Sequence, residues 1–84
     1  GLVNYVLPVD EVLPKAEALA RKIAENGPLA VRLIKQVVLS SIGRPLEDGF
    51  AIERAAAQKI LATEDAREGP RAFLEKRKPQ YSGK

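Results

Sequence analysis

The sequence predicts an all-α fold of about four helices that follow a short N-terminal strand or extended arm. Two observations predict this class. Apolar residues recur through most of the chain with the 3.6-residue spacing of amphipathic helices. Gly and Pro divide this pattern into segments with connections of two to four residues, which favour antiparallel neighbours. We expect the strand or arm over residues 1–8 and helices over 10–26, 28–43, 45–62 and 64–78.

The first eight residues are rich in β-forming side chains and end at Pro8. A lone strand leaves its backbone N–H and C=O groups without partners, so its natural partner is a sheet upstream of Gly1. In this chain alone we expect an extended arm. Asp10 can cap the helix that follows. The apolar face of that helix consists of Val12, Leu13, Ala16, Leu19, Ala20, Ile23 and Ala24.

An Asn-Gly-Pro motif separates the first and second predicted helices. Gly27 suits a left-handed backbone position, and Pro28 ends one helix and can begin the next. Gly43 is expected to end the second helix and Pro45 to begin the third. The apolar faces consist of Val31, Ile34, Val38 and Ile42 in the second helix and Leu46, Phe50, Ala57, Ile60 and Leu61 in the third.

The fourth helix is predicted to begin after Thr63, whose hydroxyl can cap free N–H groups. Three consecutive cations suit its C-terminal end, and Pro79 stops it. Pro70 either kinks a continuous helix, at a cost of about 3 kcal/mol, or starts a new turn after a break. The residues leave both possibilities open. A small apolar stripe consists of Ala66, Phe73 and Leu74.

Composition excludes several kinds of chemistry. The 84 residues include no Cys and no His, so disulfides, thiolate chemistry and the commonest metal ligand are absent. No apolar run is long enough to span a membrane and no signal peptide is visible, which favours a cytoplasmic location. The chain has no Met and begins within an apparent strand. These features indicate a piece of a longer protein.

The excess positive charge lies at the C-terminal end. The formal net charge is +3, and residues 71–84 hold five cations and one anion. Aromatic residues are only 5% of the chain, so platforms for base stacking are scarce. Basic residues confined to a tail do not make a broad binding face, so we expect no nucleic-acid partner.

No self-sufficient active site is visible. Catalysis needs a positioned acid, base, nucleophile or metal. Acidic residues such as Glu17 and Glu53 occupy polar helix positions, where solvated surface charge is the expected role. Ser40 and Ser41 have no His to activate them, and no Gly-rich phosphate loop is present. We therefore expect no catalytic residue, metal site or cofactor in this chain, and no activity from it alone.

Three stretches resemble one enzyme family. Thr63-Glu64-Asp65-Ala66-Arg67-Glu68-Gly69, with the run from Ala72 to Pro79, resembles the C-terminal end of the enoyl-CoA hydratase/isomerase (crotonase) family. Gly1-Leu2-Val3-Asn4 is similar to the strand that follows that family's catalytic region. Asn26-Gly27-Pro28-Leu29-Ala30-Val31 is similar to the turn into its next helix. The resemblance covers the whole chain in order and implies that residues 1–84 are the C-terminal helical domain of a crotonase-like protein.

The resemblance implies a function for that longer protein. The family adds water to a trans-2-enoyl-CoA or shifts its double bond. Its oxyanion hole and catalytic carboxylates lie upstream of the region that this chain matches. The partners implied are the upstream catalytic core, an acyl-CoA substrate and a homo-oligomer, either a trimer or a dimer of trimers, with no membrane. The alternatives are a non-catalytic helical interaction module with a basic tail, or another crotonase activity such as that of an isomerase.

The family motif associates Phe73 and Lys76 with the nucleotide end of CoA. On a continuous helix their i, i+3 spacing would place them on one face. A ring can pack against adenine, and an ammonium group can bind phosphate. The alternative is that Phe73 is a core anchor and Lys76 a solvated cation. Arg77 and Lys78 are weaker candidates.

Overall fold

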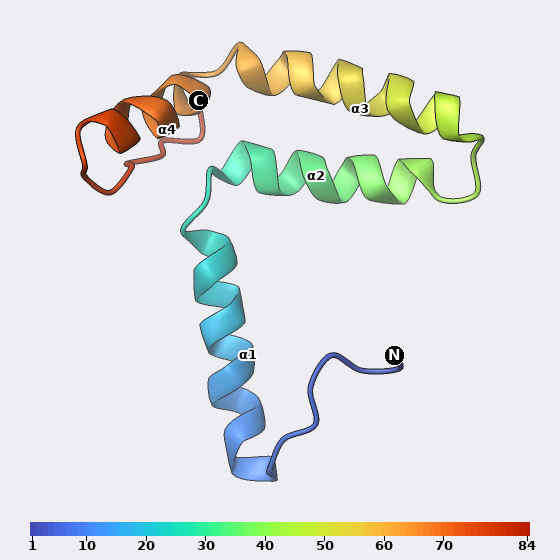
Figure 1. Ribbon diagram of the computed structural model, residues 1–84, viewed down its shortest axis with the longest axis vertical. Coiled ribbons are helices and arrows are strands. Elements are labelled where there is room, and N and C mark those ends of the chain that lie inside the picture. Colours follow the sequence, from blue (N-terminus) through green and yellow to red (C-terminus); the bar gives the residue numbers. More distant parts are fainter.

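Four α-helices follow an irregular N-terminal arm in the computed structural model, which describes all 84 residues (Figure 1). In chain order they are α1 (Val9–Ala24), α2 (Pro28–Ser41), α3 (Leu46–Leu61) and α4 (Glu64–Leu74). The predicted all-α class is confirmed. Residues 1–8 form an extended arm and no strand. None of the four helices combines the length and hydropathy needed to cross a bilayer.

The antiparallel pair of α2 and α3 forms the middle of the molecule (Figure 1). A connection of four residues joins them, as the short predicted loops require. Their apolar faces meet along the pair but leave an open groove of about 710 Å³. Ile34, Val38 and Phe50 are among the residues that line this groove, and all three are exposed. The pair therefore packs on one side and leaves apolar surface open on another.

Helix α1 projects away from that pair (Figure 1). It has no buried residue, so the predicted apolar face is formed but covered by nothing. Leu13, for example, is 67% exposed. The arm before α1 folds back far enough for the ammonium group of Lys15 to lie 4.4 Å from the ring centroid of Tyr5.

The chain has far more surface than its length requires. Its accessible area is 7437 Å², whereas a compact protein of this mass exposes about 4,900 Å². Its radius of gyration is 16.3 Å, against about 12 Å for a compact chain of 84 residues. Only four residues are buried: Gly27, Asp65, Glu68 and Ala72. Apolar burial between these helices is therefore small.

The starts of two helices differ from the sequence prediction. Helix α1 begins at Val9, and Pro8 occupies the capping position without a side-chain hydrogen bond. Asp10 therefore lies in the first turn instead of capping it. Pro45 likewise caps α3 instead of forming its first residue. In both cases proline suits the position because it supplies a carbonyl and lacks the N–H that would need a partner.

The turn between α1 and α2 also differs from the prediction. Gly27 has φ of −55° and is not left-handed. Its expected role is filled by Asn26, whose side-chain amide donates to the carbonyls of Lys22 and Ile23 at 2.9 and 3.2 Å. Since these bonds satisfy the last carbonyls of α1, no left-handed residue is needed there.

Helix α4 is continuous through Pro70, which resolves the open question about that residue. The predicted cap is confirmed, because the N–H of Ala66 donates to the Thr63 hydroxyl at 3.2 Å. The predicted C-terminal end is wrong. The helix stops at Leu74 and not at residue 78, so the three cations lie beyond it.

Candidate functional site

The end of α4 places Phe73 on the surface. Its side chain is 83% exposed, and that of Leu74 is 80% exposed. Of the predicted apolar stripe only Ala66 is partly buried, and Phe73 is not a core anchor here. The buried face of α4 is formed instead by Asp65, Glu68 and Ala72.

Lys76 occupies the turn that ends α4. Its φ is +52°, and it is the only residue besides glycine with a positive φ. Its N–H donates to the carbonyl of Phe73 at 3.2 Å, and the N–H of Arg77 donates to that of Ala72 at 3.0 Å. This pair of bonds is the Schellman ending of a helix, in which the left-handed position is usually glycine. The predicted shared helix face is wrong because Lys76 lies past the helix, although a hydrogen bond still joins it to Phe73.

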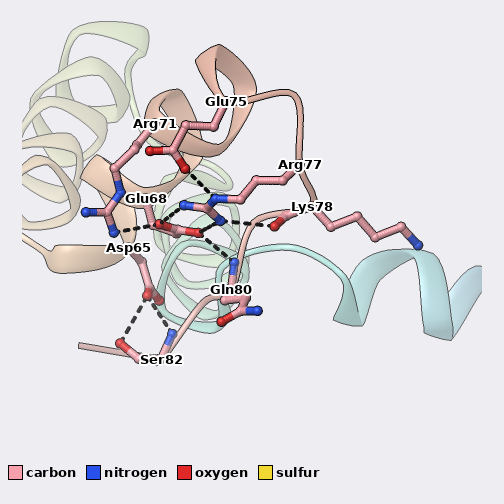
Figure 2. A network of polar contacts seen from close by, with 8 residues as sticks. All are labelled: Asp65, Glu68, Arg71, Glu75, Arg77, Lys78, Gln80 and Ser82. Carbon is pink, nitrogen blue, oxygen red and sulfur yellow. Dashed lines mark hydrogen bonds and ion pairs between the residues drawn. The ribbon is translucent and has the colours of Figure 1, made fainter.

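Beyond Lys76 the chain turns back along α4, and Glu68 holds it there. We call residues 75–84 the return tail. Figure 2 shows the Glu68 carboxylate facing Arg77, Arg71 and Gln80. Its two oxygens accept from the Arg77 guanidinium at 2.5 and 3.0 Å and from the Gln80 N–H at 2.9 Å. Arg71, one turn along α4, donates to the same carboxylate at 2.9 Å. One buried carboxylate thus ties the helix to two points of the return tail.

Asp65 makes a second tie near the end of the return tail. One carboxylate oxygen accepts from the Ser82 N–H at 2.7 Å and from its hydroxyl at 3.3 Å (Figure 2). The other accepts from the Gly83 N–H at 2.9 Å. Because Asp65 and Glu68 are three residues apart on a helix, they point to the same side and bind successive parts of the tail.

Backbone and ring contacts complete the closure. The carbonyl oxygen of Lys84 accepts from the N–H groups of Glu64 and Asp65 at 2.8 and 3.2 Å, so the tail caps the start of α4. The Tyr81 hydroxyl lies 3.4 Å from where a Cβ on Gly69 would stand, and its ring edge lies 3.7 Å from the equivalent point on Gly27. The return tail therefore fills the space between α4 and the turn before α2.

The ion pairs shift the pKa of both main partners. Hydrogen bonds from Arg77, from the Gln80 N–H and from Arg71 hold the pKa of Glu68 far below its usual range. The bonds to Glu68 and then to Glu75 raise the pKa of Arg77 above that of an ordinary guanidinium. Both groups are therefore charged at neutral pH. Neither carboxylate on this face is free to act as an acid or base, because tail donors occupy both.

The network divides the basic residues of the tail into two groups. Arg71 and Arg77 are bound to carboxylates. Lys76, Lys78 and Lys84 make no ion pair within the chain and are exposed, so their ammonium groups remain available to an anion. The free positive charge of the tail thus lies on lysines, and the backbone of one of them, Lys76, bonds to that of the exposed Phe73.

Sequence reasoning missed Asp65 and Glu68. The predicted inner face of α4 was apolar, whereas two of the three residues that are buried on it are acidic. The available signal was their spacing with Ala72, since positions 65, 68 and 72 follow one face of a helix. Pro79 ends the helical pattern, and the donors Gln80 and Ser82 follow it, which could have suggested a tail that folds back.

Comparison with known proteins places the chain in a family. The family model for enoyl-CoA hydratase/isomerase matches residues 1–84. An enoyl-CoA hydratase of Mycobacterium tuberculosis is 39% identical over 84 residues, which are 100% of this chain and 32% of that protein. A carnitinyl-CoA dehydratase of Salmonella agona is 35% identical over 88 aligned residues, covering 100% of this chain and 34% of that protein.

Solved structures agree with the sequence matches. The crystal structure of an enoyl-CoA hydratase from Bacillus anthracis superposes with a TM-score of 0.96 at 44% identity, covering 100% of this chain and 33% of that one. The chain spans about a third of the length of the relatives it matches. With the family model and the superposition both extending over the full sequence, the chain belongs to the enoyl-CoA hydratase/isomerase family.

Proposed function

We propose that this chain is the C-terminal segment of an enzyme that hydrates trans-2-enoyl-CoA, with its catalytic groups in an upstream core. The observation that carries the proposal is the match of all 84 residues to a family whose named relatives include enoyl-CoA hydratases. The absence of any His, together with the engagement of Asp65 and Glu68 in tail contacts, supports a segment without catalytic groups. The 84-residue chain alone is expected to show no hydratase activity.

The segment's proposed contribution to the enzyme has two parts. The first is contact with the core and with other subunits of a trimer or a dimer of trimers. The exposed apolar faces of α1, α2 and α3 support it, because surface of this extent is rare on a monomer. Sedimentation of the full-length enzyme tests the oligomer, and a stable monomer would contradict it.

The second part is binding of the nucleotide end of CoA by Phe73 and Lys76. The support is geometric: Phe73 is exposed, and its carbonyl accepts from the N–H of Lys76, which makes no ion pair and has a left-handed backbone conformation. That conformation costs about 1–2 kcal/mol for a residue with a Cβ. A strained backbone at a residue other than glycine suggests a role for the side chain of that residue.

Replacing Lys76 by Ala in the full-length enzyme tests the nucleotide contact. A phosphate contact remote from the thioester binds ground state and transition state alike, so KM should rise while kcat stays nearly constant. An exposed ion pair contributes about 0–1 kcal/mol, so we expect a rise of up to about five-fold that shrinks in high salt. Phe73→Ala should raise KM more, because ring packing contributes more than an exposed charge pair.

Pantetheine thioesters, which lack the nucleotide, provide the control substrate. Lys76→Ala should match the unaltered enzyme on them, and Lys59→Ala, which removes an exposed lysine from α3, should match it on every substrate. Equal impairment of Lys76→Ala on both substrate types would contradict the nucleotide contact.

Two alternatives remain open to test. Isomerase activity would appear as double-bond migration in the same assay, and the family description includes it. A helical interaction module with a basic tail is less well supported, because Arg71 and Arg77 are already bound within the chain.

The cytoplasmic location stays a prediction that cell fractionation would test.

A further inference from the structure

We infer that Glu68 is a positioning residue, which fixes the turn bearing Lys76 and so directs the Lys76 ammonium group toward the CoA nucleotide. This inference rests on the proposed nucleotide contact and deepens it. It assigns a role to a buried carboxylate that no chemistry of the segment otherwise uses.

The first step of the argument is the position of Arg77. Its N–H closes the turn around Lys76 by bonding the carbonyl of Ala72. Its guanidinium extends back to α4, where both oxygens of Glu68 accept from it at 2.5 and 3.0 Å. The residue directly after Lys76 is thus anchored through both its backbone and its side chain.

The second step is the reach of the same anchor along the tail. Glu68 also accepts from the Gln80 N–H at 2.9 Å, and Arg77 donates to the Lys78 carbonyl at 3.2 Å. Hydrogen bonds therefore hold the stretch from Lys76 to Gln80 at its first residue, at Lys78 and at its last residue. A flexible lysine gains binding strength when its backbone is already ordered, because less entropy is lost on binding.

The third step is the strain at Lys76. A left-handed backbone at a residue with a Cβ is stable only where the surroundings hold it. The Schellman bonds supply part of that constraint and also occur in helices that end freely. The bidentate pair between Glu68 and Arg77 supplies the remainder, since two parallel N–H···O bonds fix direction as well as distance.

The test uses the full-length enzyme with Glu68→Gln, which keeps the shape of the side chain and removes its charge. We expect KM for a nucleotide-bearing enoyl thioester to rise about two- to five-fold, within the range of one exposed ion pair, with kcat unchanged. KM for the pantetheine thioester should not change. Arg77→Gln removes the other half of the pair and should reproduce both results, which covers the case in which Glu68→Gln fails to fold.

The double variant distinguishes positioning from general stability. If Glu68 acts through Lys76, adding Glu68→Gln to Lys76→Ala should raise KM no further. Glu17→Gln is the matched control, because Glu17 also pairs with an arginine one turn away, at 3.4 Å, but far from the tail. It should behave as the unaltered enzyme.

Each failure points to a different conclusion. If Lys76→Ala raises KM while Glu68→Gln and Arg77→Gln do not, the positioning role is wrong and the nucleotide contact stands. If Lys76→Ala itself has no effect, the nucleotide contact fails and the positioning role fails with it. A Glu68→Gln loss that is equal on pantetheine thioesters, or that adds fully to that of Lys76→Ala, would show that Glu68 acts on the fold as a whole.

Discussion

Helix α1 and the unit formed by α4 with the return tail are held in opposite ways. Helix α1 has 16 residues, a well-formed apolar face and no buried side chain. Helix α4 has 11 residues and contributes three of the four buried positions of the chain. Two of those three are carboxylates. Helix α4 is less apolar than α1, yet it is the more buried of the two.

The comparison shows that apolar burial needs a large partner surface, whereas hydrogen bonds to a carboxylate need only a short segment. Apolar stabilisation grows with the area removed from water, at about 25 cal/mol per Å², so a lone helix gains nothing until a second surface covers it. Hydrogen bonds to a carboxylate need only a few donors in the right place. Ten residues of return tail supply those donors to α4. Helix α1 has no comparable segment beside it, and its one ion pair, between Arg21 and Glu17, is exposed.

The largest expected effect comes from breaking the closed unit at Asp65. Asp65→Ala removes the acceptor for the N–H groups of Ser82 and Gly83. Hydrogen bonds to charged groups contribute about 1.5–3 kcal/mol each, so the loss of two should weaken tail docking by at least about 3 kcal/mol. The readout is hydrogen exchange at Glu64, whose N–H bonds the Lys84 carbonyl at 2.8 Å. Its exchange should accelerate by at least about 150-fold.

Asp48→Ala is the matched control for that change. Asp48 lies in the first turn of α3, as Asp65 does in α4, but makes no contact with the tail. Its loss should cost only the helix-dipole contribution of about 0.3–1 kcal/mol. Equal effects of the two substitutions on exchange at Glu64 would contradict the role of Asp65 in tail docking.

Acid should open the same unit through Glu68. Its folded-state pKa lies below the ordinary value of 4.5, so unfolding of the tail takes up a proton. The stabilising contribution is complete above about pH 4.5 and is lost as pH falls toward the folded-state pKa. The charged groups that face Glu68 are Arg71 on α4 and Arg77 on the tail. The amide shift of Gln80 in NMR spectra should follow the loss.

Glu68→Gln provides the reference for the pH experiment. This variant should lose the Glu68 step in the Gln80 amide shift, because the carboxylate that accepts from the Gln80 N–H is gone. A transition with its midpoint above pH 4.5 in the unaltered chain would mean that the pKa of Glu68 is raised, contrary to its contacts.

The smallest expected effect comes from a substitution on α1, the exposed helix. Leu13→Ala should change the stability of α1 in this chain by less than about 0.5 kcal/mol, since Leu13 is already 67% exposed and Ala favours helix slightly more. Hydrogen exchange of the α1 amides measures it. A loss above about 1 kcal/mol would show that α1 is covered in solution. In the proposed full-length enzyme the same substitution should cost about 2–5 kcal/mol if the core buries this face.

The sequence by itself determined the all-α class, the number of helices and the cap at Thr63. These depend on local rules: the 3.6-residue period, the places where Gly and Pro interrupt it, and a hydroxyl before an acidic first turn. The resemblance of the stretch from Thr63 to Pro79 and of two shorter motifs also identified the family. Each of these features can be recognised within a window of some twenty residues, without knowledge of what packs against the helix.

Only the tertiary structure decided where α4 ends and which side of it is buried. A window over residues 64–78 contains helix-forming residues to its end, so its local pattern favours continuation past Leu74. The tail beyond the Schellman turn at Lys76 bonds to Glu68 and Asp65, up to 18 residues away along the chain. Such partners satisfy carboxylates that would otherwise need water, so an acidic face becomes the inner one. Local periodicity marks positions 65, 68 and 72 as one face of a helix, but it contains no information about which residues contact that face at such a separation.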